Sequence, residues 1–135
     1  MERVKERISV ALRALETLEE VINLNRPPSP IERDAAIQRF EYTFEAAWKA
    51  AQGFLREFEG IDVGSPKGVL RASFRVGLLT EDSVRLGLEM ADDRNRTVHT
   101  YNAELAETIY KRLSGYASLM RNWLKAMAAV SDRTE

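Results

Sequence analysis

The sequence predicts an all-α protein, an up-and-down four-helix bundle with one short extra helix. Apolar residues recur every three or four positions along four long stretches, and proline or glycine separates all of them except the last two. No segment shows the strict apolar–polar alternation of a half-buried strand. At 135 residues the chain fits one domain, which we place at residues 1–130, followed by a frayed tail at 131–135.

The first predicted helix runs from about Glu2 to Leu24. Its apolar residues form one stripe, spaced alternately by three and four as in a bundle seam. The proline-rich stretch 25–30 ends this helix because proline removes a backbone donor and clashes with the preceding turn. Ser29, Pro30 and Glu32 then have the pattern of a capping box that begins the next helix.

The second predicted helix continues to about Phe58 and is the most aromatic element, so we place it at the centre of the core. Ser65-Pro66 repeats the cap-and-proline pattern before a short helix over about 67–76. The third long helix begins near Thr80 and the last near Asn102, each at a capping side chain. These stripes predict that five large side chains are largely buried, namely Phe40, Phe44, Trp48, Leu113 and Met120.

The amino-acid composition limits the kinds of functional site that the chain can carry. The absence of cysteine excludes disulfides, cysteine-ligated metals and thiol nucleophiles, and it suits a reducing cytoplasm. A single histidine argues against a multi-histidine metal site in one chain, and we expect neither a metal nor a cofactor. The 20 basic and 21 acidic residues leave a net charge of -1, so no bulk charge draws the protein to nucleic acid. No apolar run is long enough to span a membrane and no signal peptide is visible, so we expect a cytoplasmic protein.

Residues 91–102, between the third and last helices, concentrate the polar chemistry of the chain. They include two arginines, the only histidine, His99, and Tyr101. On a continuous helix Arg94 and His99, five residues apart, would lie about 140° apart. They therefore share a face only if the backbone leaves the helix between them, as the Asn102 cap suggests. Alternatively, a two-fold dimer brings one chain's histidine to the other chain's arginine.

Arginine and histidine together suit the cutting of RNA without a metal ion. The 2′-hydroxyl of RNA attacks the adjacent phosphorus, so the protein needs no nucleophile of its own. Histidine exchanges protons near neutral pH, and arginine stabilises charge on the phosphoryl oxygens with a planar fork. The same residues also have a structural interpretation, with His99 bonded to backbone in a loop and Tyr101 half-buried at the end of the bundle.

The pattern Arg94-Asn95, three residues, His99, one residue, Tyr101 resembles the signature of the HEPN superfamily. More narrowly, it resembles the branch encoded beside minimal nucleotidyltransferases and described as nucleotidyltransferase substrate-binding proteins. The likeness covers nearly the whole chain. It extends to three further segments, 33–49, 65–67 and 77–78.

This resemblance implies a HEPN-like domain that dimerises and acts as a metal-independent endoribonuclease, the toxin of a toxin–antitoxin pair. Its partner would be a minimal nucleotidyltransferase antitoxin. Arg94 and His99 would be the catalytic pair, with Asn95 as motif support, and Tyr101 would be the hydroxyl silenced by addition of AMP (AMPylation). The alternative is a non-catalytic nucleotide- or substrate-binding subunit of a nucleotidyltransferase. A third interpretation is a helical scaffold whose loop residues are only structural.

Other polar residues are weaker candidates. Arg96 and Arg39 are candidate RNA-binding residues, although a surface ion pair explains Arg39 better. Four residues of the second helix share a face, as acid–base groups or metal ligands would, but a solvated face explains them better: Asp34, Gln38, Glu41 and Glu45. Three arginines have the spacing to track a phosphate backbone, although the net charge argues against it: Arg71, Arg75 and Arg85. We expect RNA as substrate and a homodimer in which two copies of segment 94–101 share a cleft.

Overall fold

The structure, a computed structural model, describes residues 2–133 and confirms the all-α prediction, because that range holds helices and turns and no strand. In chain order the elements are α1 (Glu2–Ile22), α2 (Pro30–Glu59), α3 (Pro66–Arg75), α4 (Glu81–Arg96), the 3₁₀ helix η1 (Thr97–His99) and α5 (Ala103–Arg133).

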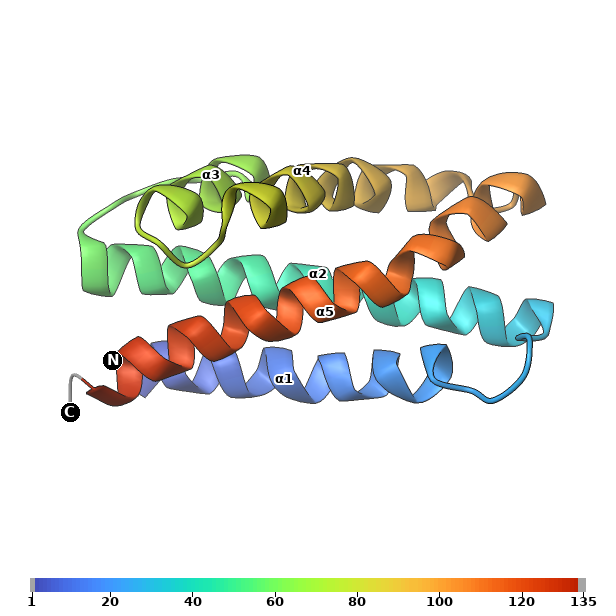
Figure 1. The fold of residues 1–135 in the computed structure, drawn as a ribbon, viewed down its shortest axis with the longest axis horizontal. Coiled ribbons are helices and arrows are strands. Elements are labelled where there is room, and N and C mark those ends of the chain that lie inside the picture. The colour runs from blue at the N-terminus through green and yellow to red at the C-terminus, as the bar shows by residue number, and fades with distance from the viewer. Residues whose placement is uncertain (1, 134–135) are drawn as a thin grey trace.

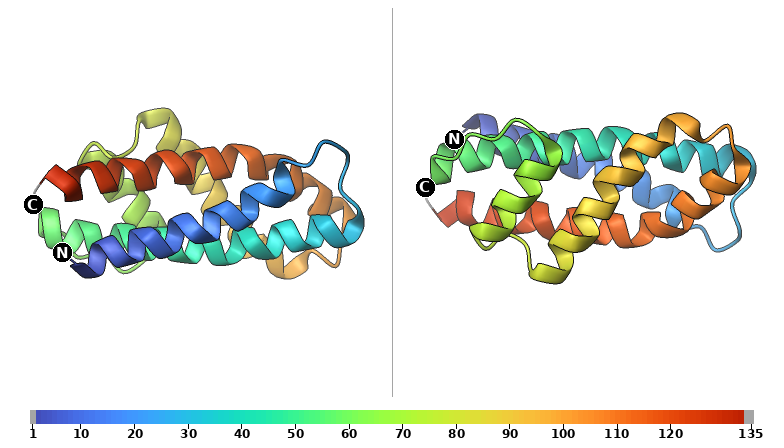
Figure 2. Two further views of the ribbon diagram at one scale, coloured as in Figure 1. Left: turned by 90° about the horizontal axis from the view of Figure 1, so that it is seen from below. Right: turned by 90° about the horizontal axis from the view of Figure 1, so that it is seen from above.

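The three longest helices, α1, α2 and α5, pack against one another along the long axis of the molecule (Figure 1). Helices α3 and α4 cover one side of this group, α3 against α2 and α4 against α5 (Figures 1 and 2). The long helices α1, α2, α4 and α5 alternate in direction, and α3 lies in the crossover between α2 and α4. This arrangement places the α4–α5 junction, which carries the predicted motif, at one end of the bundle.

The predicted stripes form the core. Every helix from α1 to α5 contributes buried apolar side chains to one continuous cluster. Each fully buried Leu or Phe side chain stabilises the fold by about 1.5–3 kcal/mol relative to an exposed one. Four of the five predicted core residues are confirmed as buried: Phe40, Phe44, Leu113 and Met120.

The fifth, Trp48, packs against this core cluster without being fully buried. Its indole is only partly buried, and its Nε1 donates a hydrogen bond to Glu45 Oε2 at 3.2 Å on the surface of α2. The fully buried tryptophan is Trp123 on α5, whose Nε1 donates to Ser73 Oγ at 3.1 Å. The difference arises because Trp48 lies beside the apolar stripe of α2 rather than on it, so its ring packs against the core without being enclosed by it.

The start of α2 confirms the predicted capping box. Glu32 N donates to Ser29 Oγ at 3.1 Å, and Ser29 N donates back to Glu32 Oε1 at 2.8 Å. Arg26 adds two hydrogen bonds to the same carboxylate, at 2.7 and 2.8 Å. These bonds, chiefly those from Arg26, lower the pKa of Glu32 to about 2.

Two helices end at residues other than those predicted from the sequence. Helix α1 ends at Ile22, two residues before the expected Leu24. Helix α5 continues to Arg133, beyond Ser131, the predicted start of the tail, and Ser131 is buried. Residues 134–135 of that tail lie outside the described residues. Within 2–133, no helix combines the length and hydropathy that a membrane crossing requires.

Candidate functional site

The motif lies where α4 changes into a tighter helix. The α-helix ends at Arg96, η1 follows over Thr97–His99, and a turn leads to α5. Asn102 caps α5 as predicted, because its Oδ1 accepts a hydrogen bond from Leu105 N at 3.2 Å. The backbone thus leaves the α-helix between Arg94 and His99, in keeping with the sequence-based expectation.

Arg94 faces α2 and bridges α4 to it. Its Nη1 donates to Thr97 Oγ1 at 3.1 Å, and it forms ion pairs with Glu41 at 3.4 Å and Glu45 at 3.6 Å. The Thr97 hydroxyl lies 2.9 Å from Glu41 Oε2 and completes the cluster. The solvated face expected for Glu41 and Glu45 is therefore not what the structure shows. These two carboxylates compensate the charge of the arginine, because α4 crosses α2 at this point.

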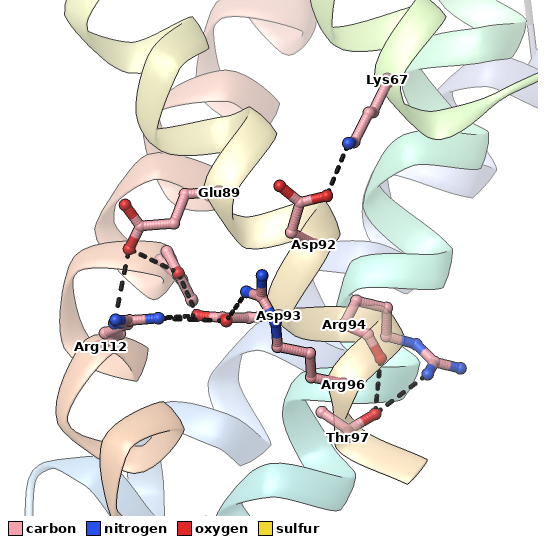
Figure 3. Close-up of polar contacts among 9 residues, drawn as sticks. Lys67, Glu89, Asp92, Asp93, Arg94, Arg96, Thr97 and Arg112 are labelled. Carbon is pink, nitrogen blue, oxygen red and sulfur yellow. Dashed lines mark hydrogen bonds and ion pairs between the residues drawn. The ribbon is translucent and has the colours of Figure 1, made fainter. Parts of the chain in front are cut away.

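Arg94 also borders a cleft of about 390 Å³ between α2, α3 and α4. Phe44 and Ala91 supply apolar lining, Asn95 lines the same cleft, and Lys67 adds a second cation. The Lys67 ammonium is paired with Asp92 at 2.6 Å (Figure 3). The cleft therefore offers two cations to a small anionic group, each already engaged with a carboxylate.

His99 and Tyr101 lie together on the outside of the bundle. Both are exposed, and 85% of the Tyr101 surface is accessible. The Tyr101 hydroxyl is 3.5 Å from His99 Nδ1, and the two rings meet edge to face with centroids 6.0 Å apart. An extended segment would place alternate side chains on one side, but here the 3₁₀ helix and the following turn bring the two rings together.

Arg94 and His99 have different partners within one chain. Among residues 2–133, no hydrogen bond or ion pair links Arg94 to His99: the arginine faces α2, and the histidine contacts Tyr101. The candidate RNA-binding arginines are also engaged. Arg96 pairs with Asp93 at 2.9 Å, and Arg39 donates to the Thr17 carbonyl at 2.7 Å.

Sequence reasoning missed Asp93, which is fully buried. Arg112 Nη1 lies 3.1 and 3.0 Å from its two carboxylate oxygens (Figure 3). The Tyr116 hydroxyl donates to the same carboxylate at 2.5 Å. Burial by itself would raise the pKa of Asp93. The hydrogen bonds from Tyr116, Arg112 and Arg96 outweigh it, so that pKa lies below its ordinary value. A detectable signal existed: Asp93 is an acid three residues after Met90, on the core face of α4, opposite an Arg–Tyr pair four residues apart on α5.

We expect Asp93→Asn to destabilise the fold by about 3 kcal/mol at neutral pH. This is the lower end of the cost of breaking a buried pair, because Arg112 is partly in contact with water. The folded-state pKa of Asp93 is lowered, so its contribution is complete above the unfolded value of about 4 and is lost as pH falls through the folded value. Urea unfolding at about pH 7 and about pH 3 should therefore show the difference shrinking in acid.

Asp92→Asn is the matched control, since it removes the neighbouring charge from a half-exposed ion pair with Lys67. Such pairs contribute about 0–1 kcal/mol. If the two substitutions lowered the free energy of unfolding equally, the buried network around Asp93 would add no more stability than an ordinary surface ion pair.

No cluster of metal ligands marks the site. Within residues 2–133, no set of three or more His, Asp or Glu side chains is arranged to hold a metal ion. The polar groups at the site are Arg94 and Lys67 in the cleft and the His99–Tyr101 pair outside it.

Comparison with known proteins gives a consistent picture. A family model described as nucleotidyltransferase substrate binding protein like matches residues 6–129. A crystal structure of a Thermus thermophilus protein has 57% sequence identity and a TM-score of 0.84, and the match covers 87% of this chain and 98% of that chain. A Haemophilus influenzae protein, described as having the fold of a substrate binding domain of a nucleotidyltransferase, has 24% identity and a TM-score of 0.75, covering 90% and 98%. At that identity the likeness shows the fold alone. No curated protein matches the sequence.

Proposed function

Because this chain belongs to the family of nucleotidyltransferase substrate binding protein-like chains, we propose that it is the substrate-side partner of a separate nucleotidyltransferase, which acts on Tyr101. One observation carries the choice of residue. The Tyr101 side chain is exposed, and its hydroxyl lies 3.5 Å from His99 Nδ1. A hydroxyl that can receive the nucleotidyl group and a side chain that can take up its proton are therefore already side by side.

The other three tyrosines are poorer acceptors. Tyr116 is buried, and its hydroxyl donates a hydrogen bond to Asp93. Burial, and to a smaller extent this hydrogen bond, raises the pKa of Tyr116. Tyr110 is half-buried, and burial raises its pKa too. Tyr42 shares a 2.5 Å hydrogen bond with Thr17. Of the four, Tyr101 alone combines an accessible hydroxyl with a neighbouring imidazole.

In the proposed transfer, the Tyr101 oxygen attacks the α-phosphorus of a nucleoside triphosphate. A new O–P bond forms, and the bond to the β-phosphate oxygen breaks so that pyrophosphate leaves. The phenolic proton passes to His99 Nδ1 when that nitrogen is unprotonated. The partner nucleotidyltransferase would bind the nucleoside triphosphate and supply the residues that activate its α-phosphate. Val98, which is 66% exposed beside His99, offers that partner an apolar contact.

The direct test is to incubate the chain with a minimal nucleotidyltransferase and ATP, and to measure the intact mass and the modified peptide. We expect one added AMP on the peptide that contains Tyr101. Modification of another residue would contradict the proposal. So would an unmodified chain that stimulates transfer to a third molecule, and that second result would support the binding-subunit alternative.

A second candidate function is metal-independent RNA cleavage by Arg94 and His99. The observation in its favour is the arrangement of the motif around the end of α4, with Arg94 at the edge of a 390 Å³ cleft. The likeness to the HEPN superfamily supports the same interpretation. In this scheme AMP on Tyr101 would place a bulky anion where an RNA phosphate must sit, and so silence the enzyme.

The geometry of one chain sets a condition on this second function. Arg94 is compensated by Glu41 and Glu45, and among residues 2–133 no hydrogen bond or ion pair joins it to His99. We propose that a second copy of the chain brings its own histidine to the arginine, in the homodimer expected from the sequence.

A further inference from the structure

A hollow of about 420 Å³ lies between α1 and α2, outside the site described above. These two helices run side by side along their length (Figure 2). Its lining comprises Arg3, Glu6, Arg7, Val10, Ala46 and Lys49. Three cations face one carboxylate in this lining, whereas the chain as a whole has a net charge of -1. The hollow is thus a local positive region on a nearly neutral molecule.

The three cations of the hollow differ from those of the Arg94 cleft in being unpaired. Among residues 2–133, none of the hydrogen bonds or ion pairs uses the side chain of Arg3, Arg7 or Lys49. Arg94 and Lys67, by contrast, are each bound to carboxylates. An incoming anion in the hollow would therefore displace no internal ion pair.

Two of the cations follow one another along α1. Arg3 and Arg7 are separated by about one helical turn on α1, or roughly 6 Å along the axis. The Arg7 guanidinium lies over Gly53 of α2, where a Cβ atom would come within 3.2 Å of Nη1. A smaller adjoining hollow of about 80 Å³ continues past Arg3 to Arg56, which pairs with Asp62 at 2.7 Å.

We propose that this α1–α2 groove binds consecutive phosphate groups, those of a nucleoside polyphosphate or of a single nucleic-acid strand. Arginine forks match phosphate oxygens, and cations one turn apart follow successive phosphates along a strand. Val10, which is 43% exposed at the edge of the hollow, supplies an apolar surface for a base or sugar. The proposal does not depend on the role of Tyr101.

The test uses two probes, a short fluorescein-labelled oligothymidylate and ATP. The oligothymidylate lacks the 2′-hydroxyl, so cleavage by Arg94 and His99 cannot interfere with a binding measurement. The variant is Arg3→Ala/Arg7→Ala. The matched control is Lys111→Ala/Lys125→Ala, which removes two exposed cations from α5 and changes the net charge equally.

For the groove variant we expect the affinity for at least one probe to fall at least about tenfold, because charged hydrogen bonds to phosphate are lost. If the strand is the ligand, the slope of log K against log salt concentration should flatten by about 1.4, or about 0.7 for each lost contact. Glu6→Gln should tighten binding of the same probe, since it removes the one carboxylate in the hollow. The control variant should match the wild type.

The two probes distinguish the sources of the phosphates. Loss of oligothymidylate binding assigns the groove to a strand, and loss of ATP binding alone assigns it to a free nucleotide. The proposal is overturned if the wild type binds neither probe, or if the groove variant and the control variant lose affinity equally.

Discussion

Tyr101→Phe is expected to abolish transfer of a nucleotidyl group to this chain while leaving the fold unchanged. Phenylalanine lacks the oxygen that would attack the α-phosphorus, so no residual transfer to this position is chemically available. The side chain is 85% exposed, and its one polar contact is the 3.5 Å approach to His99, so the substitution removes no core packing. The measurement is incorporation of radiolabel from α-labelled ATP in the presence of a minimal nucleotidyltransferase.

Tyr42→Phe is the matched control, because it removes a phenolic hydroxyl from another partly exposed tyrosine. It should be labelled as the wild type is. His99→Ala should slow labelling without abolishing it, since the acceptor oxygen remains and only the neighbouring proton acceptor is lost. Undiminished labelling of Tyr101→Phe would show that the acceptor lies elsewhere.

Under the second proposed function, His99→Ala is expected to reduce RNA cleavage by about 10²–10⁴-fold, the usual contribution of general acid–base catalysis. Arg94→Ala is expected to reduce it by about 10²–10³-fold, the usual cost of removing one charge-stabilising donor. Cleavage by the wild type should persist in EDTA and leave a 2′,3′-cyclic phosphate. Arg85→Ala, which removes an exposed arginine paired with Glu81, should cleave normally.

Mixing the two inactive variants tests whether the site is shared between copies. In a mixed dimer the Arg94→Ala chain still contributes His99, and the His99→Ala chain still contributes Arg94, so one of the two clefts is complete. Random exchange of subunits in an equimolar mixture makes about half of the dimers mixed, each with one complete cleft of two. About a quarter of the wild-type cleavage rate should then be restored. A mixture as inactive as its components would exclude a shared cleft. Full activity of His99→Ala alone would exclude the mechanism.

Much of the fold is predictable because it depends on local patterns. The three- and four-residue spacing of apolar side chains locates α1, α2 and α5 and identifies Phe40, Phe44, Leu113 and Met120 as core. Capping residues set helix starts, as at Ser29 and Asn102, because they satisfy backbone donors within the same few residues. Trp48 shows the limit: a large apolar residue beside a stripe has no local signal that decides its burial.

The site is less predictable because its contacts join elements far apart in sequence. The motif located Arg94, His99 and Tyr101, but the partners of Arg94 on α2 depend on how α4 crosses that helix. The change to a 3₁₀ helix after Arg96 follows no strong local rule, since this segment contains no proline or glycine. Asp93 is buried only because Arg112 and Tyr116 of α5 lie opposite it.

The contrast between the two tryptophans gives the molecule two optical reporters. Trp123 is sealed in the core against Ser73, so its fluorescence reports unfolding of the bundle. Trp48 is bonded to Glu45, the same carboxylate that pairs with Arg94. Any ligand or second chain that draws Arg94 away from Glu45 changes the electric field at this indole alone. In a Trp123→Phe background, emission from Trp48 would therefore follow engagement of Arg94 without any attached label.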